Sequence, residues 1–532
     1  MKGEVKDNIN MERINDLSNS KLIKRETKIK NWFGEIFNDK YDYLILFVII
    51  ASFLLYLYYF IKVGNQPIWW DEGDYLSIAK ELALNREKPE WWIGQTSLRP
   101  IALSLFFSLF FKLGFGEFSI RFFSEFLPAI GVIFVTYLLG KELFNKKIGI
   151  IASIFIATNW VFMFYTFRLL TDIPSAFLGT LCFFLFIKYD KTKKPNYLYA
   201  MVVFGVLSFL VRYLSVLVLI SILIYLLITR GYKLFLDKKM YLALVIGLLI
   251  LSPLFYFNLQ RDGDIFPALS SYHGENASAS TNPFAWDTIT FHLPLFFKVP
   301  ITIVFIIGIL ISMQIFLYLD IILKQEVKSK NNLLFLLITI FVPLIYIVFG
   351  IRAIDARYFI VFAPVLFVLC AFSTETIIKN ISYYTNFKKI YPFLLILFII
   401  LLIYSPLQTG DQFIKSRMHS YEEVKQGGIW LKENTNPSAK VITASITQNQ
   451  YYSERQSYNY FENNTKDPFL FTQKLDRIKP NYLIVSVFEP SFTPQWILDG
   501  SYILNNSERF TPLVKFPQSS EANYLVIYKV NY

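Results

Sequence analysis

The chain has 532 residues, of which 54% are hydrophobic and 18% aromatic, and its mean hydropathy is +0.42. Runs such as residues 43–60 and 393–404 carry no charge, whereas a soluble domain would interrupt them with a polar face every few residues. The net charge of +12 suits the basic cytoplasmic loops of a membrane protein, and no basic groove interleaved with aromatic residues indicates a nucleic-acid partner. The sequence therefore predicts an α-helical polytopic membrane protein.

The chain begins with a polar, Lys-rich segment, residues 1–40, which we expect to be cytoplasmic and not a cleavable signal peptide. The first apolar segment would then act as an uncleaved signal anchor. Eleven segments have the length and apolar character of spans, and together they predict a transmembrane domain over residues 41–407. These segments are 41–63, 118–140, 148–169, 174–188, 197–211, 213–229, 240–257, 294–318, 331–350, 356–378 and 390–407.

One further apolar stretch, residues 101–113, is short for a span and carries Lys112. If it lies flat, the five basic connections between spans all fall on the side of the N-terminus. If it spans, all five move to the outer side, against the positive-inside bias. The charges therefore favour an in-plane helix, eleven spans, a cytoplasmic N-terminus and an extracytoplasmic C-terminus.

The tail, residues 408–532, is predicted to be a small extracytoplasmic α/β domain. Ser420 and Glu423 have the spacing of a capping box at the start of a helix that runs to about residue 433. Three runs rich in β-branched and aromatic residues predict strands, and a helix is expected between the first two. The strands are expected at 439–444, 482–487 and 524–530, and the helix at 468–478.

Two carboxylates directly follow the first span, within the stretch Trp69-Trp-Asp-Glu-Gly-Asp-Tyr75. A structural interpretation makes Asp71 a helix cap, Asp74 a first-turn acid, and the tryptophans interfacial anchors. A functional interpretation makes the carboxylates part of a site at the outer face. The local sequence leaves both interpretations open.

Asp172 lies where one predicted span ends on the outer side and Pro174 opens the next. It could be a simple N-cap, but a carboxylate so close to the apolar zone, one helical turn from Arg168, favours a functional role. Four arginines also lie at membrane boundaries of the outer face. Any one alone could extend towards lipid headgroups, but several around one cavity would bind a phosphate. These are Arg99, Arg212, Arg352 and Arg357.

Carboxylates and arginines at the water–lipid boundary suit a lipid-phosphate substrate whose polyprenyl tail occupies an apolar groove. A carboxylate would deprotonate an incoming hydroxyl while arginines hold the phosphate. We find no Gly-rich phosphate loop, and His273, His292 and His419 lack the spacing of metal ligands. No metal site or cofactor is therefore predicted, although assistance by a divalent metal stays open.

Taken in chain order, these motifs resemble those of the GT-C glycosyltransferases, and within them the protein O-mannosyltransferases and the aminoarabinose transferases to lipid A. The resemblance covers residues 41–405 and implies a GT-C fold of about 11 transmembrane helices plus in-plane juxtamembrane helices. It also implies a polyprenyl- or dolichyl-phosphate sugar donor and inverting transfer on the extracytoplasmic side. The matching motifs are Trp-x-Asp-Glu-x-x-Tyr at 69–75, Leu-Arg-Pro at 98–100, Phe-Gly at 115–116 followed by Arg121, Arg-x-x-x-Asp-x-Pro at 168–174 and Ala-Arg-Tyr at 356–358.

The same resemblance assigns roles within the transmembrane catalytic domain. Asp71 would be the general base, Glu72 would support it, and Asp172 would position the acceptor or the site. Arg99 would contact the donor phosphate, and the other three boundary arginines are further candidates for that contact. The supporting residues would be Trp70, Asp74, Tyr75, Arg168 and Tyr358.

Departures from the family pattern, such as the single Pro100 in place of a double proline, leave the acceptor open among protein, lipid and glycan. The main alternative is a transporter or flippase of lipid-linked sugars. That alternative would predict paired halves and charges near the membrane midplane. The charges here gather at one face instead.

Overall fold

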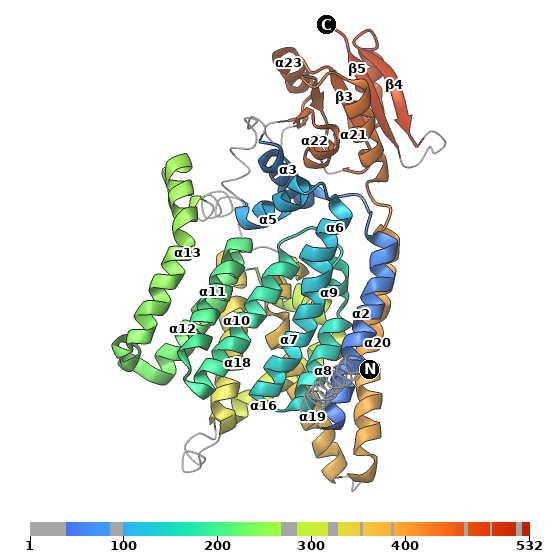
Figure 1. The fold of residues 1–532 in the computed structure, drawn as a ribbon. Coiled ribbons are helices and arrows are strands. Elements are labelled where there is room, and N and C mark those ends of the chain that lie inside the picture. The colour runs from blue at the N-terminus through green and yellow to red at the C-terminus, as the bar shows by residue number, and fades with distance from the viewer. Residues whose placement is uncertain are drawn as a thin grey trace, which may run out of the picture.

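The computed structural model describes residues 39–85, 99–267, 285–317, 328–351, 355–384, 388–461, 466–489, 492–517 and 524–532. Figure 1 shows a bundle of long helices with a small domain of strands and short helices at one end, where the C-terminus lies. The chain is therefore a polytopic helical membrane protein with a C-terminal α/β domain, as the sequence predicts.

Within the described residues, eight helices are long and apolar enough to cross a membrane, or nine if one pair bent by 116° counts as a single span. The bent pair is Thr288–Phe297 with Val299–Met313. The eight are α2 (Lys40–Val63), α6 to α7 (Glu117–Leu143), α10 (Asp172–Thr192), α12 with its flanking turns (Tyr213–Leu236), α13 (Lys238–Asp262), α18 (Lys328–Tyr346) with η5 (Ile347–Ile351), η6 (Ala356–Phe362) with α19 (Ala363–Tyr384), and α20 (Tyr391–Arg417).

The other two predicted spans form helices shorter than these eight. Residues 197–211 form α11 (Pro195–Val211), which ends at Arg212. The prediction of one continuous helix over residues 148–169 is wrong, because the region forms α8 (Lys146–Ala157) and α9 (Trp160–Tyr165). Asn159 explains the break, since its side chain accepts a hydrogen bond from the Phe162 N–H at 2.9 Å and so begins a new helix.

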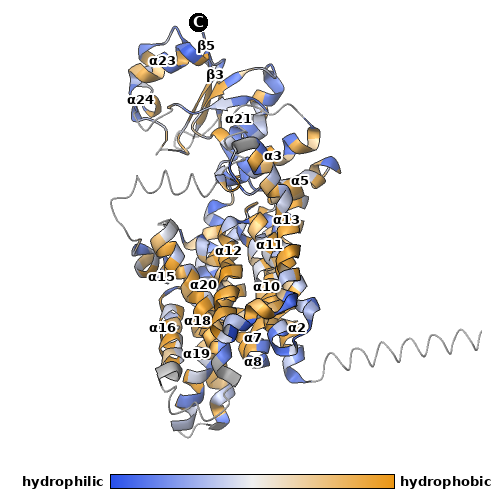
Figure 2. Cartoon of the chain, turned by 90° about the vertical axis from the view of Figure 1, so that its left-hand side faces the viewer, coloured by the Kyte–Doolittle hydropathy of each residue, from blue (hydrophilic) through white to orange (hydrophobic). Residues whose placement is uncertain are grey.

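The apolar surface of the bundle is that of a membrane protein. Figure 2 shows hydrophobic residues dominating the long helices, whereas the C-terminal domain mixes hydrophobic and hydrophilic residues. On α2, for example, Phe47 is 67% exposed and Ile61 is 71% exposed. Apolar side chains this exposed over a whole bundle indicate a lipid environment.

The short apolar stretch forms α5 (Ile101–Lys112), which packs against α3 (Trp70–Leu84) through a hydrogen bond of 3.0 Å from the Ser104 hydroxyl to the Tyr75 carbonyl. Both helices lie at the end of the bundle that faces the C-terminal domain (Figure 1). The basic connections between spans form ion pairs away from these two helices. Lys146, for example, contacts Asp42 at 2.6 Å near the start of α2. This arrangement matches the in-plane interpretation of residues 101–113.

The C-terminal domain contains a five-stranded sheet in the order β2-β1-β3-β5-β4. β1 is parallel to β2 and β3, whereas β5 is antiparallel to β3 and β4. The strands are β1 (Lys440–Ile442), β2 (Gln456–Tyr458), β3 (Tyr482–Ser486), β4 (Phe510–Phe516) and β5 (Leu525–Val530). The main helices are α21 (Glu422–Asn434), α22 (Ile446–Ser453) and α23 (Pro468–Ile478).

The three predicted strands and the two predicted helices of this domain are confirmed, with two differences in detail. α20 continues to Arg417, beyond the expected end at 407, because the helix accommodates Pro406 in its interior. The expected capping box is wrong, since α21 begins after Tyr421, which adopts a left-handed conformation with φ of 68° and provides no side-chain cap.

Candidate functional site

A cavity of about 320 Å³ lies below α3, at the end of the bundle that carries the C-terminal domain. Its lining comes from α3, the start of α5, the turn before α10, the break between α11 and α12, α13, and the region from α18 to η6. The charged residues in this lining are Asp71, Arg99, Asp172, Arg212 and Arg357. The apolar and aromatic lining includes Tyr75, Leu170, Phe209, Tyr213, Leu214, Val216, Phe266, Tyr346 and Tyr358.

Asp71 is the second residue of α3, and its carboxylate lies between two arginines. Arg99 donates to its Oδ1 at 2.7 Å, and Arg357 donates to its Oδ2 at 3.0 Å. Burial acts to raise the pKa of Asp71, but the two guanidinium groups outweigh burial and hold the pKa below its usual range. Asp71 is therefore an ionised hydrogen-bond acceptor that faces the cavity.

Arg99 also donates to Asp74 at 3.0 Å, so one guanidinium joins two carboxylates of the same helix. Asp74 lies one turn after Asp71 on α3, is only 3% exposed, and does not line the cavity. The two acids therefore lie in different environments, and their pKa values are shifted in opposite directions.

Asp74 is expected to make stability depend on pH. Burial raises the pKa of Asp74 to about 6, against the attraction of Arg99, from an ordinary value of 3.8. Between pH 3.8 and about 6, the folded protein therefore binds one proton more than the unfolded chain. The stability that Asp74 contributes is full below pH 3.8 and is lost as the pH rises through about 6. Thermal unfolding in detergent should show wild type losing stability relative to Asp74→Asn from about pH 4 to pH 6. An identical pH dependence in both proteins would contradict this assignment.

Asp172 begins α10 and is 1% exposed, with Arg212 as its charged partner. The Arg212 guanidinium lies 3.0 Å from Asp172 Oδ1 and donates to the Thr171 hydroxyl at 2.9 Å. Arg212 is placed by the extended backbone between α11 and the next helical turn, with φ of −149°, so its interruption of the apolar run is a real helix break. The aromatic ring of Tyr358 lies 5.4 Å from the same guanidinium.

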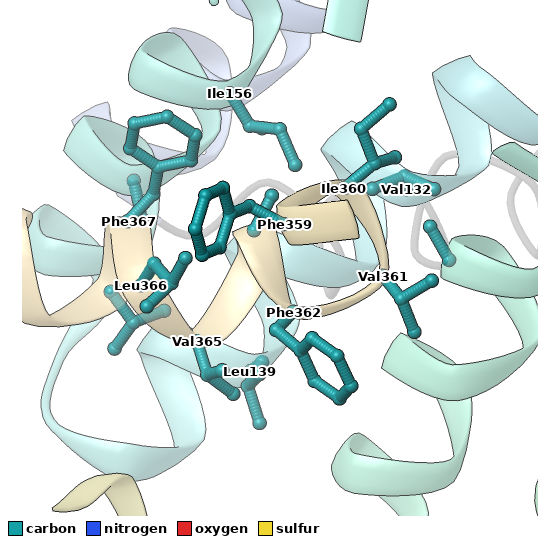
Figure 3. Close-up of a cluster of buried hydrophobic side chains, with 14 of the residues drawn as sticks. Val132, Leu139, Ile156, Phe359, Ile360, Val361, Phe362, Val365, Leu366 and Phe367 are labelled. Atoms are coloured by element: carbon teal, nitrogen blue, oxygen red, sulfur yellow. The ribbon is translucent and has the colours of Figure 1, made fainter. Parts of the chain in front are cut away.

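Arg357 and Tyr358 are held in place by the apolar residues that follow them in η6. Phe359 and Val361 are at most 1% exposed, and Figure 3 shows Phe359 pointing towards Ile156 and Phe367 within the core cluster. Arg357 can therefore extend from a rigid base to Asp71, and it also pairs with Asp355 at 3.3 Å. Arg352 lies outside the described residues.

Glu72 points away from the cavity into a fully buried charge cluster. Its two carboxylate oxygens lie 3.7 Å from Arg168 and 3.7 Å from Arg121. All three side chains are at most 1% exposed. Burial raises the pKa of Glu72, and the two arginines counteract that effect.

Arg168 and Arg121 also hold the segment before α3. The Arg168 guanidinium stacks 3.7 Å from the centre of the Trp69 ring, and Arg121 donates to the carbonyl oxygens of Gly64 and Gln66. The cluster of Glu72, Arg121 and Arg168 therefore fixes the first turn of α3 from inside the bundle.

The structure thus brings Asp71, Asp172, Arg99, Arg212 and Arg357 to one cavity, together with Tyr75 and Tyr358. Glu72 and Arg168 lie behind this cavity, and the Trp70 indole turns to the C-terminal domain. Sequence reasoning included Arg121 in a matching motif but gave it no role, although its position at the start of an apolar span was a signal for one. In the described part of the chain, no group of three or more His, Cys, Asp or Glu side chains is placed to hold a metal ion.

Comparisons with known proteins agree with this architecture. Residues 98–257 match the model of a family described as dolichyl-phosphate-mannose-protein mannosyltransferase. No curated protein sequence matches the chain. Among solved structures, ArnT from Cupriavidus metallidurans bound to undecaprenyl phosphate superposes with a TM-score of 0.62 at 12% identity, covering 92% of this chain and 98% of that chain.

A second similar structure is the archaeal oligosaccharyltransferase AglB from Archaeoglobus fulgidus, in complex with an inhibitory peptide and a dolichol-phosphate. It superposes with a TM-score of 0.60 at 14% identity, covering 90% of this chain and 74% of that chain. At these identities the likeness concerns the fold, and it extends over both the helical bundle and the C-terminal domain. The chain therefore has the fold of the GT-C glycosyltransferase superfamily, as its motifs predict.

Proposed function

We propose that this protein is a membrane glycosyltransferase that transfers a sugar from a polyprenyl- or dolichyl-phosphate donor to an acceptor hydroxyl at the extracytoplasmic face. The observation that carries the proposal is the single cavity in which an ionised Asp71 and three arginines meet an apolar wall. The lipid phosphates in the two similar structures support this kind of donor.

The composition of the cavity suits a lipid phosphate. Its lining carries three arginines and two aspartates, and Asp74 and Asp355 contact Arg99 and Arg357 from outside the lining, so a phosphate would compete with carboxylates for these guanidinium groups. Guanidinium groups bind phosphate oxygens through paired hydrogen bonds, and Phe209, Leu214 and Val216 form an apolar surface beside them. A donor with an anionic head and an isoprenoid tail fits both surfaces at once.

The proposed reaction is one displacement. The acceptor oxygen attacks the anomeric carbon while the bond from that carbon to the phosphate oxygen breaks, and the acceptor proton passes to Asp71. The lipid phosphate leaves with the bonding electron pair, and arginines stabilise the charge that builds on it. Attack opposite to the leaving group inverts the anomeric configuration.

Donor binding also has a consequence for the base. Arg99 and Arg357 neutralise Asp71 in the structure described here. A bound phosphate would attract the same guanidinium groups and weaken their hold on Asp71, which would raise its affinity for a proton. The base would therefore become effective when the donor is present.

The proposed sidedness follows from the distribution of charge. The cavity and the C-terminal domain lie at one end of the bundle (Figure 1), whereas the basic connections near Lys146 and Lys188 pair with acids near helix ends outside that site. The positive-inside bias places those connections in the cytoplasm. The cavity, the C-terminal domain and the acceptor are then extracytoplasmic.

Arg212 offers a test of phosphate binding. We expect Arg212→Ala to weaken the binding of polyprenyl phosphate to purified protein roughly 10- to 100-fold. This change in affinity corresponds to the usual contribution of a hydrogen bond to a charged group. The double variant with Asp172→Asn removes the buried charge that Arg212→Ala leaves unpaired, and should bind equally weakly if phosphate contact is the cause. Arg230→Ala, which breaks a pair outside the cavity with Asp190, is the control. Unchanged affinity in the double variant would remove Arg212 from the phosphate site.

A further inference from the structure

We propose that Glu489 of the C-terminal domain is a positioning residue for glycosyl transfer, because it holds the first turn of α3 through Trp70 and so fixes the direction of Asp71. The inference rests on the proposed function, and it gives the C-terminal domain a part in the chemistry. The domain would complete the active site although it contributes no residue to the cavity lining.

Trp70 is held by the C-terminal domain at its side chain and at its backbone. The indole N–H donates to the Glu489 carboxylate, and the ring packs against Phe492 with centroids 5.1 Å apart. The Trp70 carbonyl oxygen accepts from the Thr447 hydroxyl at 2.8 Å. Three contacts of different kinds therefore connect this one residue to the domain.

The backbone of α3 also approaches the domain closely. A Cβ added at Gly73 would lie 2.8 Å from the backbone carbon of Thr447, so the first turn of α3 packs directly against the start of α22. Just before the helix, the Ile68 N–H donates to the Tyr452 hydroxyl at 2.9 Å. Only a residue without a side chain permits this approach, and the approach leaves the first turn little freedom to rotate.

The same helical turn is held from three sides. Trp70 contacts the C-terminal domain, Asp71 contacts the cavity arginines, and Glu72 contacts the buried arginines of the bundle. Successive residues of a helix point about 100° apart, so a rotation that frees Trp70 also moves the Asp71 carboxylate. Displacement of a reacting group by about 1 Å can reduce a rate about 100-fold. Glu489 therefore acts on the reaction through Trp70, without touching the substrate.

The test compares Glu489→Ala, Trp70→Phe and their double variant in a transfer assay with a polyprenyl-phosphate sugar. Each single variant should lower kcat about tenfold and change the KM for the donor less than about twofold. The double variant should be no worse than either single one, because both changes break the same hydrogen bond. Glu489→Gln should keep most of kcat, since its amide oxygen still accepts from the indole.

Lys80→Ala is the matched control, because Lys80 links the later part of α3 to Glu454 of the same domain at 2.5 Å. It should leave kcat near that of wild type. Glu489→Ala with unchanged kcat, or a double variant whose loss equals the product of the single losses, would overturn the proposal.

A second measurement separates this proposal from the proposed function. If wild type transfers no sugar, the proposed function fails, and hydrogen exchange of the α3 amides still tests the contact. Faster exchange in the first turn of α3 in Glu489→Ala than in Lys80→Ala would support the positioning role. Equal exchange in wild type and both variants would overturn it.

Discussion

Asp71→Asn is expected to reduce sugar transfer about 10²- to 10⁴-fold, the range that general-base catalysis contributes. Asparagine keeps the size of the side chain and one oxygen that accepts from Arg99 or Arg357, but it cannot take a proton at neutral pH. Folding should therefore be retained, and binding of polyprenyl phosphate should stay equal or become tighter as the arginines lose their competing carboxylate. Initial rates at saturating donor, together with donor affinity, check this result.

Asp355→Asn is the control for this variant. Asp355 also pairs with Arg357, at 3.3 Å, but it does not line the cavity. We expect it to reduce transfer less than about tenfold, since it removes one charge beside the same arginine and no base. Turnover of Asp71→Asn equal to that of the control would remove Asp71 from the role of base.

Glu72→Ala is expected to destabilise the fold by about 3–5 kcal/mol, the cost of removing one partner from a buried ionic cluster. The substitution leaves Arg121 and Arg168 buried without their shared counter-charge, and it also opens a void beneath α3. Thermal unfolding of the purified protein in detergent should show a large fall in Tm. Transfer activity should fall with it, because the first turn of α3 carries Asp71.

The control for stability is Lys193→Ala, which removes the exposed i,i+3 pair between Lys193 and Asp190. Exposed pairs contribute little, so its Tm should stay close to that of wild type. A Glu72→Ala protein as stable as this control would show that the buried cluster does not hold the fold together.

Much of the architecture is predictable from the sequence because the membrane imposes a simple length rule. Each predicted span contains helix, although residues 148–169 are interrupted and residues 294–318 bend by 116° after Phe297. The charge of the connections identified α5 as a helix outside the set of long spans. What hydropathy could not predict was the interruption at Asn159, because a polar side chain inside an apolar run can either face a neighbour or cap a new helix. The tertiary packing decides between these outcomes.

The site was predictable in part for the same reason. Topology placed Asp71, Asp172 and the boundary arginines on one side, and the structure brings five of these side chains to one cavity. The pairing of Asp71 with Arg357 joins residues 286 positions apart, and the contact of Trp70 with Glu489 joins residues 419 positions apart. Hydropathy and local motifs carry no information on such contacts. Trp70, read as a possible membrane anchor, in fact contacts the C-terminal domain.

The most direct test of the proposed function is release of polyprenyl phosphate from radiolabelled polyprenyl-phosphate sugars by the purified protein in lipid vesicles, with Asp71→Asn run alongside. Release by wild type and not by the variant, with the sugar recovered on an acceptor hydroxyl in inverted configuration, is the expected result. Movement of intact donor between leaflets by both proteins, with no release by either, would contradict it and indicate a transporter of lipid-linked sugars.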